Sequence, residues 1–218
     1  MLLSILALVT VAAASPLPDV LLPRATCYDG VYVIGARGSE EAAGFGSVAS
    51  VVSGVLSAIS NSGSVALDYP ASVVDPLYDD SVIDGINAMI TLIENYVDSC
   101  GGEIVLVGFS QGANVVTDVL AGNSPPVVSA ITVFGDPSFT DGQSFDAGTD
   151  TTSNGIFARS KGGASLALLN TYAAKLKSYC DTGDRYCASG DDADAHSQEV
   201  PTWGTAAVDF IASLSTSH

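Results

Sequence analysis

Apolar and polar positions along the chain follow two patterns, one typical of strands and one typical of helices. Short runs rich in valine and isoleucine predict strands over residues 31–34, 64–69, 104–107 and 130–134. Longer stretches with apolar residues three and four positions apart predict helices over residues 47–59, 81–97, 111–120 and 203–214. The two kinds of segment alternate along most of the chain.

This alternation predicts the fold class. Strands that alternate with helices are typical of a parallel sheet that is covered by helices on both faces. The run at 104–107 is apolar at every position, as expected of a strand buried on both sides. We therefore expect an α/β fold, a three-layer α/β/α sandwich around a mainly parallel sheet. Residues 135–163 are predicted to form a long loop, and residues 165–177 a short strand or helix.

The first fifteen residues are interpreted as a targeting segment. Residues 1–14 are almost wholly apolar, end in small side chains and stop before Pro16. A run of this length fits a signal peptide and is too short to span a bilayer. We expect residues 1–15 to be a signal peptide, residues 16–25 a pro-segment or flexible N-terminus, and residues 26–218 a single domain of a secreted, extracellular protein.

Charge excludes some partners. The chain of 218 residues has 7 Lys+Arg against 24 Asp+Glu, a formal net charge of −17, so phosphate backbones and anionic membranes would repel it. We expect no nucleic-acid or membrane partner. The 47% hydrophobic content is too high for a disordered chain and sufficient for the core of one domain.

Four cysteines agree with export from the cell. Cys27, Cys100, Cys180 and Cys187 are an even set, which predicts two disulfides with three possible pairings. Cys180 and Cys187 are close enough in sequence to close a tight loop, which would leave Cys27 to pair with Cys100. A zinc site is disfavoured because the chain has no C-x-x-C pair and one internal histidine.

The chemistry is concentrated around Ser110. Here a predicted strand runs into Gly108-Phe109-Ser110-Gln111-Gly112, a G-x-S-x-G sequence, and a predicted helix follows. A sharp strand-to-helix turn of this kind presents a serine hydroxyl above the sheet, and the flanking glycines relieve crowding. The start of the helix offers N–H groups where an oxyanion would form. Ser110 is therefore the predicted nucleophile.

A serine nucleophile needs a base and a carboxylate. Of the two histidines, His218 is the last residue, so elimination selects His196. Ten aspartates lie between Ser110 and His196. Asp184 and Asp181 both lie between Cys180 and Cys187, where a disulfide would hold a carboxylate rigidly, and spacing does not choose between them. The acidic stretch that follows, 191–194, is interpreted as solvated and does not match an EF-hand calcium loop.

Four sequence blocks together resemble the cutinase and acetylxylan esterase family of secreted fungal serine esterases, which has a cutinase-like α/β-hydrolase fold. They are residues 36–39 (ARGS), 108–112 (GFSQG), 180–187 (CDTGDRYC) and His196.

This resemblance implies roles for particular residues. It implies a catalytic triad of Ser110, Asp184 and His196, which selects Asp184 over Asp181. It also implies an oxyanion hole made by Ser39 and the backbone N–H of Gln111. The disulfides that it implies are Cys27–Cys100 and Cys180–Cys187. Two-step acyl transfer of this type needs no metal or organic cofactor.

The resemblance leaves two substrates open. Residues 37–40 look like cutinases, whereas residues 134–137, 148–159 and 175–181 look more like acetylxylan esterases. The segment 188–195 has three carboxylates and no apolar residue larger than alanine, which favours a hydrated carbohydrate bearing small acyl groups. We expect a monomeric esterase that deacetylates acetylated xylan in plant cell walls.

Two alternatives stay open. The apolar segment 73–78 keeps cutin, a waxy polyester, as an alternative polymeric substrate. A catalytically dead, secreted carbohydrate-binding protein is the non-enzyme alternative, and the intact Ser–Asp–His set argues against it.

Overall fold

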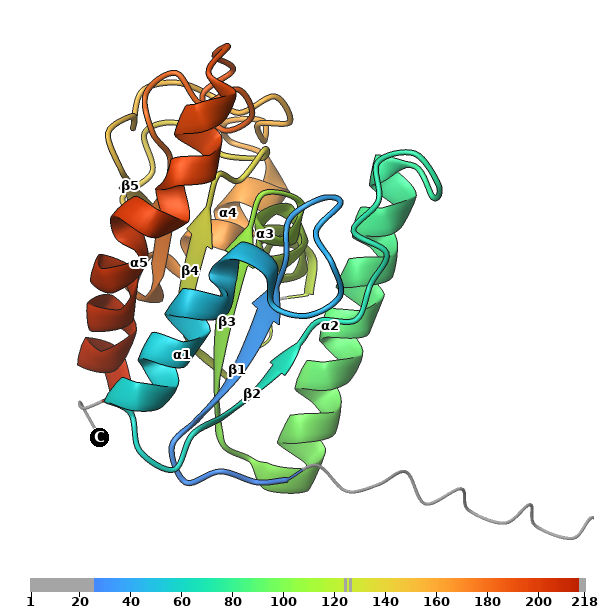
Figure 1. Cartoon of the computed structure of the whole chain (residues 1–218), viewed down its shortest axis with the longest axis vertical. Helices are drawn as coiled ribbons and strands as arrows, with labels where there is room; N and C mark the ends of the chain where they lie inside the picture. The colour runs from blue at the N-terminus through green and yellow to red at the C-terminus, as the bar shows by residue number, and fades with distance from the viewer. Residues whose placement is uncertain (1–25, 124, 126, 216–218) are drawn as a thin grey trace, which may run out of the picture.

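Six strands form one sheet in which every neighbouring pair is parallel (Figure 1). The structure is a computed structural model that describes residues 26–123, 125 and 127–215. The predicted signal peptide, the predicted pro-segment and His218 lie outside the described residues. The strand order is β2-β1-β3-β4-β6-β5. The strands are β1 Val31–Ala36, β2 Gly63–Ala66, β3 Glu103–Phe109, β4 Val128–Phe134, β5 Asp146–Ala147 and β6 Leu176–Tyr179.

Helices cover both faces of the sheet, which confirms the three-layer α/β/α sandwich. In Figure 1, α1 and α5 lie on one face, and α2, α3 and α4 lie on the other. Their bounds are α1 Ala49–Ala58, α2 Tyr78–Cys100, α3 Gln111–Asn123, α4 Ala164–Asn170 and α5 Ala193–Ser215, with short 3-10 turns η1 at Gly46–Val48 and η2 at Ala173–Lys175.

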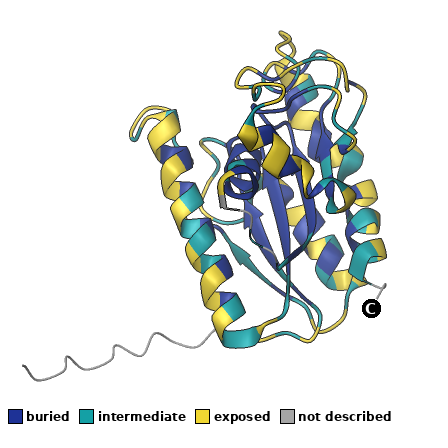
Figure 2. Cartoon of the chain, turned by 180° about the vertical axis from the view of Figure 1, so that it is seen from behind, coloured by how far each residue is buried: buried dark blue, intermediate teal, exposed yellow. Residues whose placement is uncertain are grey.

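The sheet separates two apolar cores. Alternate side chains of β3 point to opposite faces, so Ile104 and Leu106 pack with α2 and α3, while Val105 and Val107 pack with α1 and α5. Figure 2 shows the strands as the buried centre of the molecule. Burial on both faces explains why the predicted strand at 104–107 contains no polar position.

The last helix differs from its prediction, because α5 begins at Ala193, well before the predicted start at Trp203. The carboxylate of Asp192 accepts the backbone N–H groups of Asp194 (2.8 Å) and Ala195 (3.1 Å), which caps the first turn. The helix continues through Pro201, whose missing N–H leaves the carbonyl of Ser197 without its helical donor at the exposed surface.

Two further regions contain more regular structure than predicted. Residues 135–163, predicted as a loop throughout, include the two-residue strand β5. Residues 165–177, predicted as a strand or a helix, contribute to both, because α4 is followed by η2 and by β6 at the sheet. Strands this short have too little periodicity to be distinguished from loops in sequence.

The chain changes direction across the sheet between β1 and β3. From β1 it moves outward to β2, and then crosses to β3 on the other side of β1. In parallel sheets, ligands bind where the carboxyl ends of two such strands diverge. The loops after Ala36 and Phe109 meet at this point, so the sequence blocks around Ser39 and Ser110 come together.

Two disulfides tie the fold at distant places. Cys27 is bonded to Cys100, which joins the segment before β1 to the end of α2. Cys180 is bonded to Cys187 and closes the loop that contains Asp184. In the part of the chain that the structure describes, no helix combines the length and the apolar character needed to cross a membrane.

Candidate active site

Ser110 occupies the turn between β3 and α3 in a strained conformation. Its φ is +54°, in the left-handed region that a residue with a side chain rarely adopts. The backbone holds it there, because its N–H donates to the carbonyl of Phe134 (2.9 Å) and its carbonyl accepts the N–H of Asn114 (3.0 Å). Such a turn projects the hydroxyl away from the sheet.

The glycines on either side of Ser110 have separate steric roles. A Cβ at Gly108 would lie 2.6 Å from the carbonyl oxygen of Gly112, so this glycine lets α3 start directly behind the strand. A Cβ at Gly112 would lie 2.3 Å from the carbonyl oxygen of Ala36, at the end of β1. The two glycines therefore bring the helix, Ser110 and the loop after β1 within contact.

His196 lies in the first turn of α5 and is bonded to Asp184. The distance from its Nδ1 to Oδ2 of Asp184 is 2.7 Å. Its ring packs between the rings of Phe109 and Tyr186, with centroids 4.8 and 4.5 Å away. These contacts fix the plane of the imidazole and leave Nε2 as its other nitrogen for proton transfer.

Asp184 is fully buried and its carboxylate has several donors. Its Oδ1 accepts the backbone N–H groups of Tyr186 (2.6 Å) and Cys187 (2.9 Å). Burial by itself raises the pKa of Asp184, but the hydrogen bond and charge of His196, together with the other donors, outweigh burial and lower the pKa below its ordinary value. The carboxylate is therefore ionised and oriented toward the imidazole.

Asp181, which sequence spacing left as the alternative to Asp184, has different partners. Its carboxylate accepts hydrogen bonds from the indole N–H of Trp203 (3.0 Å) and from the backbone N–H of Thr149 (3.0 Å). The structure thus brings Asp184, and not Asp181, to His196.

Ser110, His196 and Ser39 line one cavity of about 350 Å³. The other lining residues are mostly aromatic or aliphatic: Val73, Tyr78, Phe109, Pro137, Ile156, Phe157 and Tyr186. A cavity of this kind, apolar with a few polar groups at one place, is typical of a small-molecule site.

The loop after β1, which carries Ser39, is held by two charged side chains. The buried guanidinium of Arg37 donates to the carbonyl of Tyr69 (2.5 Å). The carboxylate of Glu41 accepts the backbone N–H of Gly38 (2.6 Å). This bracing keeps the backbone of Ser39 in place beside the turn at Ser110, as preorganised hydrogen-bond donors require.

Gln111 follows Ser110 and is the first residue of α3. Its side chain is fully buried, donating to the carbonyl of Ser72 (2.9 Å) and accepting from the hydroxyl of Ser81 (3.0 Å). The group that it offers near Ser110 is therefore its backbone N–H, one of the first N–H groups of the helix, which have no carbonyl partner within the helix.

Exposed side chains close to the cavity are of two kinds. Apolar ones are exposed among and next to its lining residues, where Val74 is 74% and Leu77 63% exposed, and Ile156 and Phe157 are also exposed. The segment 188–195, which leads into His196 in the sequence, carries three exposed carboxylates.

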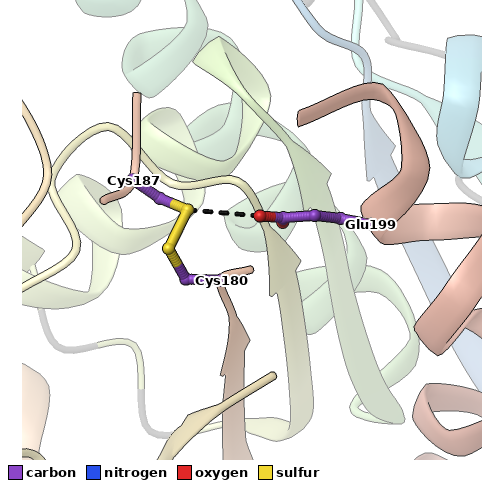
Figure 3. A group of neighbouring side chains, drawn as sticks. All are labelled: Cys180, Cys187 and Glu199. Atoms are coloured by element: carbon purple, nitrogen blue, oxygen red, sulfur yellow. Dashed lines mark hydrogen bonds between the residues drawn. A yellow bond between two sulfur atoms is a disulfide. The ribbon is translucent and has the colours of Figure 1, made fainter. Parts of the chain in front are cut away.

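The described residues contain one cluster with metal-ligating residue types, formed by Cys180, Cys187 and Glu199 (Figure 3). The two cysteines are bonded to each other, so neither offers the thiolate that a metal requires. This cluster does not fit a metal ion.

Several residues that shape the site were not predicted from sequence. Arg37 and Glu41 act through tertiary hydrogen bonds, and Ile156 and Phe157 lie in a stretch predicted only as loop. Glu199 is buried beside the Asp184 loop, although the three residues before it are polar. No local sequence signal distinguishes these residues.

The geometry combines a strained serine, a histidine bonded to a buried carboxylate, and backbone N–H groups at a helix start. This combination is suited to acyl transfer through a covalent intermediate.

Comparisons with known proteins agree with this chemistry. The cutinase family model matches residues 26–214. Acetylxylan esterase 2 of Talaromyces purpureogenus is 35% identical over 225 residues, covering 93% of each chain, and Cutinase 11 of Verticillium dahliae is 29% identical, covering 88% of this chain and 71% of its own. The solved catalytic core of the Trichoderma reesei acetyl xylan esterase superimposes with a TM-score of 0.78 and 32% identity, covering 87% of this chain and 100% of that one.

Proposed function

This chain belongs to the cutinase family and is a carboxylic ester hydrolase, and we propose that it works by serine acyl transfer. His196 takes the proton of the Ser110 hydroxyl as the oxygen attacks the ester carbonyl. Asp184 holds the imidazole in the required orientation and stabilises the imidazolium that forms. His196 then passes the proton to the leaving alcohol, which departs as the acyl group stays on Ser110.

The second half of the reaction repeats the first with water. His196 takes a proton from water, the hydroxide oxygen attacks the acyl-Ser110 carbonyl, and the acid leaves as Ser110 regains its proton. In both halves, the backbone N–H groups of Gln111 and Ser39 are proposed to hold the oxyanion. Each such donor contributes about 3 kcal/mol to transition-state stabilisation in comparable enzymes.

The observation that carries this proposal is the 2.7 Å contact between His196 and the buried Asp184 at the wall of the cavity that contains Ser110. A buried histidine–carboxylate pair is costly to maintain without a purpose, because both groups give up hydration. Its location beside a strained serine supports a catalytic role.

We propose acetylated xylan as the substrate. The exposed carboxylates of segment 188–195, which directly precedes His196 in the sequence, favour a hydrated carbohydrate chain over a waxy surface. Aromatic rings in the cavity wall, including Tyr78 and Phe157, are suited to packing against the apolar face of a sugar ring. The similarity to acetylxylan esterases over nearly the whole chain agrees with this choice.

A second candidate substrate is cutin, favoured by the exposed apolar side chains close to the cavity. These are Val74, Leu77, Ile156 and Phe157. Exposed apolar groups at a cavity mouth are suited to contact with an apolar polymer or a long acyl chain.

Hydrolysis rates across 4-nitrophenyl esters from acetate to dodecanoate separate these substrates, with Ser110→Ala as the control. A steep fall beyond acetate, together with release of acetate from acetylated xylan, is the expected result. A maximum at butyrate or longer, with hydrolysis of cutin, would favour the second candidate. Full activity in the Ser110→Ala variant would contradict serine catalysis for either substrate.

We also propose that the protein is exported. The apolar segment 1–15 has the composition of a signal peptide. Two disulfides are typical of an oxidising compartment. N-terminal sequencing of the protein recovered from a culture medium tests this, and the expected first residue lies after Ser15. Retention of the uncleaved chain inside the cell would contradict export.

A further inference from the structure

Glu199 is a buried acidic residue that the proposed mechanism does not use. It lies in α5, one turn after His196, and its side chain is 0% exposed. Glutamates are seldom fully buried unless they are paired, because an ionised carboxylate is strongly stabilised by water. A residue of this kind beside the active site needs a physical explanation.

One oxygen of the Glu199 carboxyl has identifiable partners. Oε1 accepts the backbone N–H of Asp181 (3.0 Å). It also lies 3.2 Å from Sγ of Cys187, the contact drawn in Figure 3. That sulfur is part of a disulfide and carries no proton, so it donates nothing to the carboxyl.

The other oxygen, Oε2, faces the catalytic histidine. It is buried, and no hydrogen-bond donor of the described residues contacts it. A Cβ added at Gly135, after β4, would lie 3.3 Å from this oxygen and 2.8 Å from Nδ1 of His196. Oε2 therefore lies in the same small space as the nitrogen that bonds Asp184.

The charges around Glu199 favour its neutral form. Burial raises the pKa of Glu199 well above its usual value, and the negative charge of Asp184, its hydrogen-bond partner, and that of Asp181 raise it further. His196 is the other titratable neighbour on the same helix. The pKa of Asp184 moves in the opposite direction, as expected when one of two adjacent carboxyl groups keeps the proton.

We propose that Glu199 is a positioning residue of the active site. As a neutral carboxylic acid it donates its Oε2 proton to the Asp184 carboxylate. Glu199 then extends the proposed triad of Ser110, His196 and Asp184 by one hydrogen bond. It acts through Asp184 and does not contact the substrate. The proton satisfies the buried oxygen and adds a third kind of donor to Asp184, after His196 and the backbone of Tyr186 and Cys187.

The inference rests on the proposed catalytic roles of Asp184 and His196. A donor to the Asp184 carboxylate reduces its freedom to rotate and so holds Oδ2 in line with Nδ1 of His196. Because Glu199 does not line the cavity, its loss changes the rate of the chemical step and leaves substrate binding nearly unchanged.

Two substitutions test the role. Glu199→Gln keeps a neutral donor and an acceptor of nearly the same shape, whereas Glu199→Leu keeps the approximate volume and removes both. We expect Glu199→Gln to retain kcat within about threefold of the wild type, and Glu199→Leu to lose about 10- to 100-fold in kcat with little change in KM. Gln198→Leu, an exposed neighbour on α5, is the matched control and keeps full activity.

The pH profile separates a neutral Glu199 from an ionised one. If Glu199 is neutral, Glu199→Gln removes no charge, so the acid limb of kcat/KM stays where it is in the wild type. If Glu199 is an anion, the same substitution removes a negative charge beside His196 and moves the acid limb about one pH unit lower. A shifted limb, or equal damage by both substitutions, would overturn the proposal.

A spectroscopic measurement keeps the test independent of turnover and of the proposed function. The chain has two histidines, so ring-¹⁵N labelling gives two sets of signals, and His196→Gln identifies one of them. The downfield proton of the His196–Asp184 bond is expected to be unchanged in Glu199→Gln and lost or shifted in Glu199→Leu. An unchanged signal in Glu199→Leu would overturn the positioning role, while activity retained in Ser110→Ala would instead refute serine catalysis. If Glu199→Leu does not fold, the acid limb of kcat/KM and the downfield proton signal of Glu199→Gln still test the proposal.

Discussion

At the scale of single residues, the turn at Ser110 depends on the absence of a side chain at two glycines. Gly112 lies where the start of α3 touches the end of β1, and Gly108 lies where the strand passes under the helix. Their contacts are with backbone atoms, which cannot move aside without disturbing the sheet. The strained φ of Ser110 is maintained by this close packing.

Gly112→Ala is therefore expected to damage both stability and activity. Its Cβ would lie 2.3 Å from the carbonyl oxygen of Ala36, and separating α3 from β1 displaces Ser110. We expect the free energy of unfolding to fall by about 2–3 kcal/mol and kcat to fall at least tenfold. Urea unfolding and steady-state kinetics measure the two effects.

Gly122 supplies the matched control within the same helix. No atom lies within 4 Å of a Cβ added there, so Gly122→Ala is expected to raise the free energy of unfolding by about 0.5–1 kcal/mol and to leave kcat unchanged. Equal stability of the Gly112→Ala variant and the wild type would contradict the steric account.

Single residues also mark the limit of sequence-based prediction. The turn at Ser110 could be predicted because strand, glycines and helix are neighbours in sequence. Asp184 and Asp181 could not be distinguished by spacing, because they share one eight-residue loop. They differ in their distant partners, since Asp181 accepts from Trp203 and Asp184 contacts His196.

At the scale of elements, the first turn of α5 positions the histidine. Asp192 caps this turn through its contacts with Asp194 and Ala195, and its own N–H donates to the carbonyl of Gly183 in the Asp184 loop (3.0 Å). The cap thus connects the helix that carries His196 to the loop that carries its carboxylate.

Removing this cap is expected to weaken the contact between His196 and Asp184. Asp192→Ala should lower the free energy of unfolding by about 1 kcal/mol and lower kcat, because His196 lies one turn from the unprotected end. Asp192→Asn keeps a capping oxygen and should behave like the wild type. Thermal melts and ester hydrolysis measure both, and a kcat in Asp192→Ala equal to that of Asp192→Asn would contradict the role of the cap.

At the same scale, Asp146 in β5 is expected to make the stability of the fold depend on pH. Burial raises the pKa of Asp146 to about 7, even though the N–H of Gln143 donates to its carboxyl (2.7 Å). Since the unfolded pKa is about 3.9, the folded chain holds this proton more tightly. The resulting stability is fully present below about pH 4 and is lost as the pH rises through about 7.

Asp146→Asn removes this dependence. Relative to the wild type, the variant should gain stability between about pH 4 and 7, by about 1–2 kcal/mol once solvent screening is considered. Any loss of stability caused by the amide itself is the same at every pH. The change with pH in the difference between the urea midpoints of variant and wild type therefore reports the titration of Asp146. A difference that stays constant from pH 4 to pH 8 would contradict the raised pKa.

The boundaries of α5 show why some elements could not be predicted. The apolar spacing predicts a start at Trp203, whereas the cap at Asp192 and the packing of Glu199 and Val200 begin the helix earlier. The burial of Glu199 was not predicted for the same reason, since its side chain turns inward only in the longer helix. The parallel sheet, in contrast, could be predicted from its apolar runs.

At the scale of the whole molecule, the two disulfides are expected to have different effects. Cys27–Cys100 spans 73 residues and restrains the unfolded chain far more than Cys180–Cys187, which spans 7. Replacing the first pair by alanine should cost about 4 kcal/mol of stability and leave kcat nearly unchanged. Replacing the second should cost about 2 kcal/mol but lower kcat more, because Asp184 lies in its loop. Denaturant midpoints and kcat at low denaturant measure both, and the reverse ranking in kcat would contradict these roles.

The whole account depends on Ser110 being the residue that carries the acyl group. A 4-nitrophenyl alkylphosphonate tests this directly, because attack on phosphorus forms a bond to the serine oxygen as nitrophenolate leaves, and the adduct is stable. Mass spectrometry of the digested protein should find one phosphonyl group per chain, on the peptide that contains Ser110, with none in Ser110→Ala and slow labelling in His196→Gln. A label on a different residue, or an active enzyme that takes no label, would contradict the account.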